Sequence, residues 1–401
     1  MLKRRQFLRN TLGSALLLPA IRGRLAFAAG GGDQRFVLVI LRGAMDGLAA
    51  VPAYGDGDYS GKRGSLALPA PGTVGGILKL DALFGLHPAF KNFHALYQDH
   101  ELLVAHAVAT PYRSRSHFDG QKLLENGTTD PLGADDGWLN RALAALPRNK
   151  SEDEAIALAQ AIPLVLYGKQ PASSWAPSVF PDLDALTIER LTQLYEPDPF
   201  FSGQLQEALE VRKMAGNLAD KDMRGMGSPG SLAQLPTMVQ AAAGFLTDPV
   251  GPRIAVLQIG GWDTHANQGA SNGYLANQFK ALDDAVGLLK EHMKEAWKKT
   301  AVVIVSEFGR TVAVNGTRGT DHGTGSAAFV LGGAVKGGRV LADWPGLSTG
   351  QLFQGRDLNP TLDMRSLFKT VLHKHLHVPE GALEKTVFPD SKSAKILDDV
   401  V

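Results

Sequence analysis

Five short apolar runs, rich in Val, Ile and Leu, are spaced along the chain at residues 35–41, 102–108, 254–259, 301–305 and 327–331. None of them shows the strict alternation of apolar and polar positions that marks a half-exposed strand. Continuous apolar runs of this kind are typical of strands that are buried on both faces of a parallel sheet. The pattern therefore predicts a large sheet, and residues 164–166 are a further, shorter candidate strand.

One long helix is marked by its spacing. From Leu275 to Trp297, apolar residues recur every three or four positions, which predicts an amphipathic helix. This helix joins the strands at 254–259 and 301–305, so the three elements form a βαβ unit, for which a right-handed crossover is expected. Shorter helical patterns occur at residues 87–97, 118–124 and 361–375.

Residues from about 170 to 250 have a different character. Helical spacing runs from Ala185 to Leu218 and again from Leu235 to Leu246, with a loose Gly/Met/Ser/Pro stretch between them at 225–230. We interpret this region as a helical insertion or cap. The chain has no internal repeat, so the pattern as a whole predicts a single doubly wound α/β domain that carries a helical insert.

The amino-acid composition excludes several kinds of protein and of functional site. The chain has 401 residues, of which 44% are hydrophobic, and a net charge of +1, which excludes global disorder. It has no cysteine, which excludes a disulfide scaffold, a Cys-ligated zinc site, an iron–sulfur cluster and a cysteine nucleophile. A metal must therefore be bound by His, Asp, Glu and other oxygen donors.

The basic and acidic residues are distributed unevenly along the chain. Six of the 41 basic residues lie within residues 1–28, which contain no acidic residue, so the rest of the chain has 35 basic against 40 acidic residues. A mildly acidic protein without a basic stripe does not suit binding to a phosphate backbone. We therefore expect no nucleic acid among its partners.

The basic N-terminal segment has the features of a twin-arginine signal peptide. Arg4-Arg5 precedes a short apolar run from Leu12 to Ile21 and an A-x-A cleavage pattern at Ala26-Phe27-Ala28. An amphipathic helix is the alternative. The run is too short to span a bilayer, and no later segment is long enough either, so we expect no stable membrane span in the mature chain. The Tat export machinery is then a partner, residues 29–401 form the mature domain, and the protein is periplasmic or secreted.

Polar residues follow the predicted strands, at the sheet edge where α/β proteins bind ligands. The βαβ unit places three of them, Asp263, His265 and Glu307, at one edge. Two imidazoles and two or three carboxylates suit a divalent ion such as zinc, manganese or magnesium, which would activate a water or a serine hydroxyl. The candidate metal ligands are Asp46, Asp263, His265, Glu307 and His322.

Each of these motifs also has a purely structural alternative. Asp263 and His265 are also compatible with an ordinary turn, Glu307 and Arg310 with an ion pair, and Asp321-His322 with a hydrogen-bonded loop pair. The metal site is favoured because all three motifs fall at strand ends of one sheet.

A basic segment precedes the helix at 118–124. It reads Arg113-Ser114-Arg115-Ser116-His117, and a serine at a helix N-terminus between arginines lies in a positive potential that suits an oxyanion. Helix capping is the alternative role for Ser114 or Ser116. No G-x-G-x-x-G motif follows the first predicted strand, and no predicted strand leads directly into a G-x-S-x-G elbow, which argues against a dinucleotide-binding protein and an α/β-hydrolase.

Taken together, the motifs resemble the exported proteins grouped as domain of unknown function 1501 (DUF1501). That family is similar to the alkaline phosphatase/sulfatase superfamily of metal-dependent phosphate and sulfate ester hydrolases. The resemblance runs from about residue 33 to 389 and implies an alkaline phosphatase-like, three-layer α/β/α sandwich with a mainly parallel central sheet. The motifs are Leu41-Arg42-Gly43, Asp46-Gly47, Leu86-His87-Pro88, Arg115-Ser116-His117-Phe118-Asp119, Gly261-Trp262-Asp263-Thr264-His265, Ser306-Glu307-Phe308-Gly309-Arg310-Thr311 and Gly319-Thr320-Asp321-His322-Gly323.

The resemblance also implies roles for the residues. Asp263, His265 and His322 look like the ligands of the superfamily's first metal. The second site departs from the pattern, because Arg42-Gly43 stands near the usual first Asp, with Asp46 offset, and Glu307-Phe308 replaces an Asp-His pair.

For catalysis, the resemblance implies Ser116 as the nucleophile, with Ser114 or a metal-activated water as alternatives. Arg115 and Arg310 would bind the oxyanion, and His117 would assist the leaving group or support the ligands. The sulfatase motif C-x-P-x-R is absent, which makes sulfate esters the less favoured substrate.

Two functions follow. The first is an exported metal-dependent hydrolase of small anionic phosphate or related esters, with zinc favoured and manganese, magnesium or calcium as alternatives. The second is a protein of the same fold without turnover that binds or assembles at the cell envelope. The metal content of the mature protein separates the two.

Overall fold

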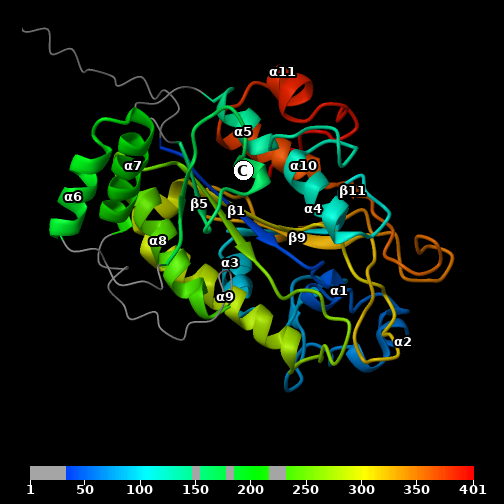
Figure 1. Ribbon diagram of the computed structural model, residues 1–401. Coiled ribbons are helices and arrows are strands. Elements are labelled where there is room, and N and C mark those ends of the chain that lie inside the picture. Colours follow the sequence, from blue (N-terminus) through cyan, green and yellow to red (C-terminus); the bar gives the residue numbers. More distant parts are fainter. Residues whose placement is uncertain (1–32, 147–153, 178–184, 216–231) are drawn as a thin grey trace, which may run out of the picture.

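A single sheet runs through the centre of the protein, with helices on both of its faces (Figure 1). We analysed a computed structural model, which describes residues 33–146, 154–177, 185–215 and 232–401. The expected three-layer α/β/α arrangement is confirmed. The N-terminal signal segment and the loose stretch at 225–230 lie outside the described residues.

The strands are mostly short and buried. Those of the central sheet are β1 (Arg35–Leu41), β4 (Leu102–Ala109), β5 (Ala155–Leu158), β6 (Ser173–Trp175), β7 (Ile254–Ile259), β8 (Thr300–Ser306), β9 (Ser326–Leu331), β10 (Arg339–Leu341) and β11 (Leu362–Asp363). A separate antiparallel pair is formed by β2 (Leu78–Lys79) and β3 (Gly85–Leu86).

The strand order of the sheet is β10-β4-β9-β8-β1-β7-β5-β6, with β11 also paired to β4. Among the described residues, all pairings of this sheet are parallel except those of β9, which runs antiparallel to both β4 and β8. This one reversed strand matters for the site, because it begins at the edge where β1, β4, β7 and β8 end. The mainly parallel sheet expected from the continuous apolar runs is therefore confirmed.

Helices cover the two faces in separate groups (Figure 1). One face carries α3 (Lys91–Gln98), α8 (Leu235–Thr247) and α9 (Tyr274–Met293), and the other carries α4 (His117–Asn126), α5 (Trp138–Leu143), α10 (Met364–Thr370) and α11 (Glu380–Ala382). The short helices α1 (Gly47–Ala50) and α2 (Tyr59–Arg63) follow β1. Helices α6 (Ala185–Tyr195) and α7 (Pro199–Ala215) pack against each other at the periphery, and α7 also contacts α8.

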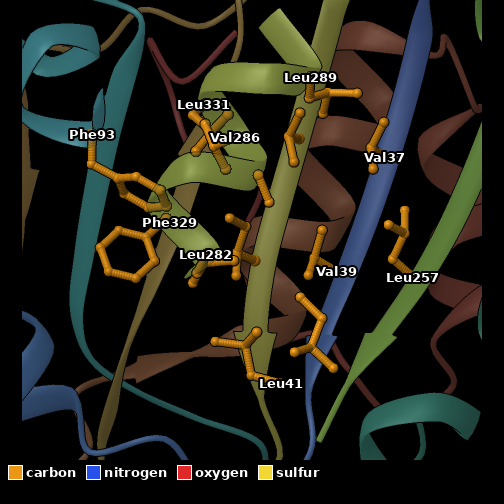
Figure 2. Close-up of a cluster of buried hydrophobic side chains, with 14 of the residues drawn as sticks. Val37, Val39, Leu41, Phe93, Leu257, Leu282, Val286, Leu289, Phe329 and Leu331 are labelled. Carbon is orange, nitrogen blue, oxygen red and sulfur yellow. The ribbon is translucent and has the colours of Figure 1, made fainter. Parts of the chain in front are cut away.

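Successive side chains of β1 point to opposite faces of the sheet, so they contribute to two separate parts of the core. Val37, Val39 and Leu41 pack in the cluster that includes residues of α9, and Figure 2 shows them beside Leu282 and other α9 side chains. Their neighbours Phe36, Leu38 and Ile40 pack on the opposite face, under α5 and α10. Each buried side chain of this size contributes roughly 1.5–3 kcal/mol, so β1 fixes both layers to the sheet.

The five long apolar runs are strands as expected, whereas the strand expected at 164–166 is wrong. Residues Leu164–Leu166 form one 3₁₀ turn after Pro163, and the amide groups of Leu166 and Tyr167 both donate to the Pro163 carbonyl instead of to a neighbouring strand. The nearby strands are β5 and β6, which are too short to stand out in the sequence. Helix α8, interpreted as part of the insertion, lies on the sheet beside α9.

Candidate metal centre

Five loops meet at one edge of the sheet. Four of them follow the carboxyl ends of β1, β4, β7 and β8, and the fifth leads into β9. Because β9 runs antiparallel to β4 and β8, a residue just before it lies at the same edge as residues just after the other strands. This is how His322 reaches the loops that carry His117, Asp263 and His265.

These four residues, called the His/Asp cluster below, bring their side-chain tips together. The Nε2 atom of His322 lies 3.0 Å from His117 Nε2 and 3.0 Å from His265 Nε2. Asp263 Oδ1 lies 3.2 Å from His322 Nε2 and 3.1 Å from His265 Nε2, and Asp263 Oδ2 lies 3.4 Å from His117 Nε2. Candidate ligand atoms of His117, Asp263 and His322 all lie within 4.8 Å of one another. The structure thus brings together Asp263, His265 and His322, three of the candidate ligands, and adds His117.

The other ring nitrogen of each imidazole is bound to an oxygen. His117 Nδ1 donates to Glu307 Oε1 (2.8 Å), His322 Nδ1 to the carbonyl of Arg115 (3.0 Å), and His265 Nδ1 to Asp321 Oδ1 (3.2 Å). A carbonyl and an ionised carboxylate only accept hydrogen bonds, so the proton of each neutral ring is on Nδ1.

Each Nε2 atom then directs a lone pair into the cluster. Lone pairs this close repel unless a cation lies among them, either a proton or a metal ion. Three imidazole nitrogens and one carboxylate form a donor set that suits zinc, and each ring has the oxygen partner that metal-bound histidines usually have. The residues of the cluster therefore fit a divalent ion.

Glu307 supports the His/Asp cluster by fixing the ring of His117. Its carboxylate is fully buried and accepts hydrogen bonds from the Gly43 amide (2.9 Å), His117 Nδ1 (2.8 Å), Gln121 Nε2 (3.1 Å) and the Ser306 hydroxyl (3.0 Å). Burial alone would raise the pKa of Glu307, but the hydrogen bond from His117 and the other donors lower it below its ordinary value. This corrects the expectation that Glu307 is itself a ligand: it lies behind His117 and orients it.

The residue after Glu307 forms an apolar wall. The ring of Phe308, which is buried, stacks on His117 with 4.9 Å between centroids and lies 5.4 Å from the ring of His322. The Phe308 ring thus restricts the rotation of these two imidazoles.

Asp263 is oriented by a buried arginine. Arg310 Nη1 donates to Asp263 Oδ1 (2.5 Å), Arg310 Nε donates to the Thr320 hydroxyl (3.1 Å), and its Nη2 donates to the Thr320 carbonyl. Burial would raise the pKa of Asp263, but the hydrogen bond and charge of Arg310 lower it. Each of the three guanidinium nitrogens has a hydrogen-bond partner and the side chain is inaccessible to solvent, so in this structure Arg310 fixes a candidate ligand and does not present donors to an oxyanion.

Arg115 also acts through its backbone. Its φ angle of +64° lies in the left-handed region, which is unfavourable for a residue with a side chain and is found where a site demands it. The turn directs the Arg115 carbonyl toward His322 Nδ1. The side chain points elsewhere, donating from Nε to Asp357 (2.7 Å) and from Nη2 to Gln354 (2.7 Å). The oxyanion-binding role of Arg115 therefore stays a prediction.

Ser116 is the N-cap of α4, yet its hydroxyl makes no capping hydrogen bond. Only its amide has a hydrogen bond to a side chain, to the Tyr112 hydroxyl (3.1 Å). The capping alternative is thus not realised, and the hydroxyl has none of the hydrogen bonds found among the described residues. Its role as nucleophile stays a prediction.

Asp46 lies outside the cluster, which corrects its assignment as a ligand. Its Oδ1 accepts from the Ala49 amide and caps α1, while its Oδ2 accepts from Arg63 (2.6 Å) and Gln268 (2.7 Å). The carboxylate is buried and satisfied by these donors. Gln268 also accepts from Thr320, which links Asp46 to Arg310 through hydrogen bonds.

The cluster opens to solvent on one side. The side chains of His265, Asp263 and Asp321 are 45%, 42% and 53% exposed, whereas those of His117 and His322 are 24% and 26% exposed. The hydrogen bond from Asn315 is the main cause that lowers the pKa of Asp321. The side chain of His265 is therefore accessible to solvent on this side.

The comparisons with other proteins come in three kinds. Comparison with curated proteins gives no match. Among solved structures, the chain is similar to the C-terminal periplasmic domain of EcEptC from Escherichia coli in complex with Zn, at 11% identity and a TM-score of 0.44, over 91% of this chain and 88% of that chain. It is also similar to the phosphonate monoester hydrolase of Agrobacterium radiobacter, at 13% identity and a TM-score of 0.37, over 87% and 78% of the two chains. These likenesses are distant and carry no information on the chemistry of this chain.

The comparison with family models shows the family to which this chain belongs. The model of the family described as "Protein of unknown function (DUF1501)" matches residues 100–387, which include every residue of the His/Asp cluster and its partner Glu307. The resemblance to this family is thereby confirmed over residues 100–387, and the chain belongs to the DUF1501 family.

Proposed function

We propose that the His/Asp cluster binds one divalent cation, zinc by preference, and that the protein is a metal-dependent hydrolase of phosphate or related esters. The observation that supports this most is that His322 Nε2 lies 3.0 Å from the Nε2 atoms of both His117 and His265, beside Asp263, with each ring fixed through its Nδ1. Three nitrogens and one oxygen favour zinc over the harder manganese, magnesium and calcium ions.

A bound zinc ion supplies a Lewis acid and lowers the pKa of water or of a hydroxyl next to it. The chain's own residues arrange the rest. Glu307 and Phe308 keep His117 in one orientation, Arg310 keeps Asp263 in place, and the exposed side of His265 admits the ester. Ser116, whose hydroxyl is not used for capping, is the proposed nucleophile, with Ser114 or water as alternatives.

The proposal is tested on a panel of aryl phosphate esters. We expect the metal-loaded protein to hydrolyse at least one of them, and metal removal or His322→Ala to abolish the reaction. Ser116→Ala should abolish hydrolysis and leave the metal content unchanged, whereas Ser114→Ala, which removes the alternative nucleophile, should leave hydrolysis intact. Hydrolysis that survives in Ser116→Ala would assign the attack to Ser114 or water, and a metal-loaded protein that hydrolyses no ester would refute the hydrolase.

A second function is favoured by a specific observation. The Nε/Nη2 edge of Arg115 is bound to Asp357, and the buried guanidinium of Arg310 is bound to Asp263, so neither presents that edge to an oxyanion. This suits a protein of the cell envelope that binds or assembles without turnover. Metal binding without hydrolysis in the panel above is the result that this alternative expects.

We further propose export by the twin-arginine pathway, on the strength of Arg4-Arg5 and the apolar run that follows. Within the part of the chain that the structure describes, no helix has both the length and the apolar character required to cross a membrane. Changing both arginines to lysine should leave the precursor in the cytoplasm, and undiminished export of this variant would refute the pathway.

A further inference from the structure

Arg356 lies on a tight turn beside the His/Asp cluster. The turn runs from Phe353 to Asp357, whose backbones are hydrogen-bonded to each other, and Gly355 within it has a φ angle of +66°. The turn is also held against the loop that follows β8, because the Val312 amide donates to the Arg356 carbonyl (3.3 Å). The side chain of Arg356 therefore starts from a backbone that is fixed on both sides.

Two hydrogen bonds orient the guanidinium of Arg356. Its Nε donates to Asp357 Oδ1 (2.8 Å), and its Nη2 donates to the backbone carbonyl of His322 (2.5 Å), a residue of the cluster. The other oxygen of the buried Asp357 carboxylate accepts from Arg115 Nε (2.7 Å). Two guanidinium groups, which are always charged in proteins, thus share one carboxylate, so positive charge is in excess at this point.

Arg356 keeps donors that the described part of the protein does not use. A guanidinium has five N–H groups, and Arg356 uses the one on Nε and one of the two on Nη2. Its Nη1 has no hydrogen-bond partner among the described residues, and its side chain is 47% exposed. The remaining N–H groups of Nη1 and Nη2 lie parallel on the outer edge of the guanidinium, the arrangement that binds two oxygens of one phosphate.

The other two arginines beside the cluster are less suited to this task. All three guanidinium nitrogens of Arg310 have hydrogen-bond partners, and its side chain is inaccessible to solvent. Arg115 keeps its Nη1 without a partner among the described residues, but its Nε and Nη2 are bound and its side chain is only 20% exposed. The guanidinium of Arg115 also lies over the ring of Phe353, 5.7 Å from the centroid. Of the three arginines, Arg356 therefore presents the most accessible donors.

We propose that Arg356 binds the tetrahedral anionic group of the substrate, a phosphate or related oxyanion, through the edge formed by Nη1 and Nη2. The guanidinium is already oriented by Asp357 and His322, so binding costs little further side-chain entropy. Because Nη2 is hydrogen-bonded to the backbone of His322, an anion on this edge lies next to the His/Asp cluster. The assignment of the anion to an ester rests on the proposed function, whereas the binding of the anion does not.

The test is a calorimetric titration of two probes, inorganic phosphate and phenylphosphonate, into the purified protein at constant ionic strength. Phenylphosphonate has the oxygens of a phosphate group but no ester bond, so it represents the organic substrate without turnover. We expect both probes to bind and Arg356→Gln to weaken both at least tenfold. Arg356→Lys keeps the charge but not the two-donor edge and should weaken them at least threefold.

Arg339→Gln is the matched control. Arg339 is a partly exposed arginine that also donates from Nη2 to a backbone carbonyl (2.7 Å), but it lies on β10, beside the start of β4 and away from the edge that carries the cluster. Its replacement removes the same charge and should leave both affinities unchanged. Metal content and thermal unfolding are measured on the same samples and should be equal in all of them.

Binding of neither probe, or wild-type affinity in either variant of Arg356, would overturn the proposal. Binding of inorganic phosphate alone would identify a site for the free ion and overturn the assignment to an ester. A loss of binding that occurs only together with a loss of metal or of fold would make Arg356 a support of His322 and overturn it as well. Turnover separates this inference from the hydrolase. Binding that depends on Arg356 without hydrolysis of any ester refutes the hydrolase alone, whereas hydrolysis with unchanged binding in Arg356→Gln refutes this inference alone.

Discussion

His117 lies between the buried carboxylate of Glu307 and the ring of His322, with a hydrogen-bond distance to each. The spacing of residues in the sequence suggests the opposite division of roles, with Glu307 as ligand and His117 as support. The difference arises because Glu307 already accepts hydrogen bonds from four groups of the protein, which no sequence pattern reveals. A carboxylate so satisfied is a better partner for an imidazole than a ligand for an ion.

Glu307→Gln tests this division. Glutamine keeps the size of the side chain but removes its charge and brings an amide group against the donors of Gly43 and Gln121. We expect the affinity for zinc, measured by competition with a chelator, to fall about 10- to 100-fold, the usual effect of losing the partner of a metal-bound histidine. Glu154→Gln, whose carboxylate pairs with Arg253 at the start of β7, should leave the affinity unchanged. Wild-type affinity in Glu307→Gln would contradict the assigned role.

Asp321 illustrates which features of the site can be predicted from the sequence and which cannot. It stands next to His322 in a motif that the sequence marks, but its carboxylate accepts from the ring of His265 across two loops. Adjacency in the chain favours a pair between Asp321 and His322, whereas the fold pairs His322 with a backbone carbonyl. The residue types could be predicted, but the pairing depends on loop geometry.

At the scale of elements, the convergence of the loops follows from the direction of the strands. The apolar runs predict β1, β4, β7, β8 and β9, and a parallel sheet predicts that residues after the first four meet. The sequence does not show that β9 is antiparallel, and this reversal is what places His322 at the shared edge. The short strands β5 and β6 were missed because three or four residues are too few to form a pattern.

The loop after β1 offers a test at this scale. Gly43 has a φ angle of +120°, and a Cβ atom there would lie 2.6 Å from the backbone nitrogen of Asp263. Gly43→Ala should therefore displace the loop of Asp263, lower the unfolding free energy by about 1–3 kcal/mol and weaken zinc binding. Gly57→Ala, where a Cβ would meet no atom within 4 Å, is the control and should change neither quantity. Denaturant unfolding and chelator competition measure both, and equal behaviour of the two variants would refute this role of Gly43.

For the whole molecule, two buried histidines predict how stability depends on pH. Burial lowers the pKa of His87 and of His106 to about 4, although hydrogen bonds to backbone carbonyls oppose the shift. Between about pH 6.5 and pH 4, these groups take up protons in the unfolded chain but not in the folded one. Each should therefore reduce the unfolding free energy by roughly 1.4 kcal/mol per pH unit as the pH falls through this range.

Denaturant unfolding at several pH values measures this slope. The variant His106→Gln should be less dependent on pH than the wild type by about 1.4 kcal/mol per unit between pH 6 and pH 4.5. Above pH 6.5 the two proteins should differ by a constant amount. An equal slope in both proteins over the acidic range would show that His106 is not neutral in the folded state.

The most direct test of the central claim is the metal content of the exported protein, purified without added metal and measured by mass spectrometry of the elements. We expect about one zinc ion per chain in the wild type, and its loss in His322→Ala, the residue whose Nε2 lies 3.0 Å from two other imidazole nitrogens. Circular dichroism should show that this variant keeps its fold, so that the loss of zinc is due to the change at the site. Wild-type protein without a stoichiometric metal, or metal that remains in His322→Ala, would contradict the assignment of the His/Asp cluster as a metal centre.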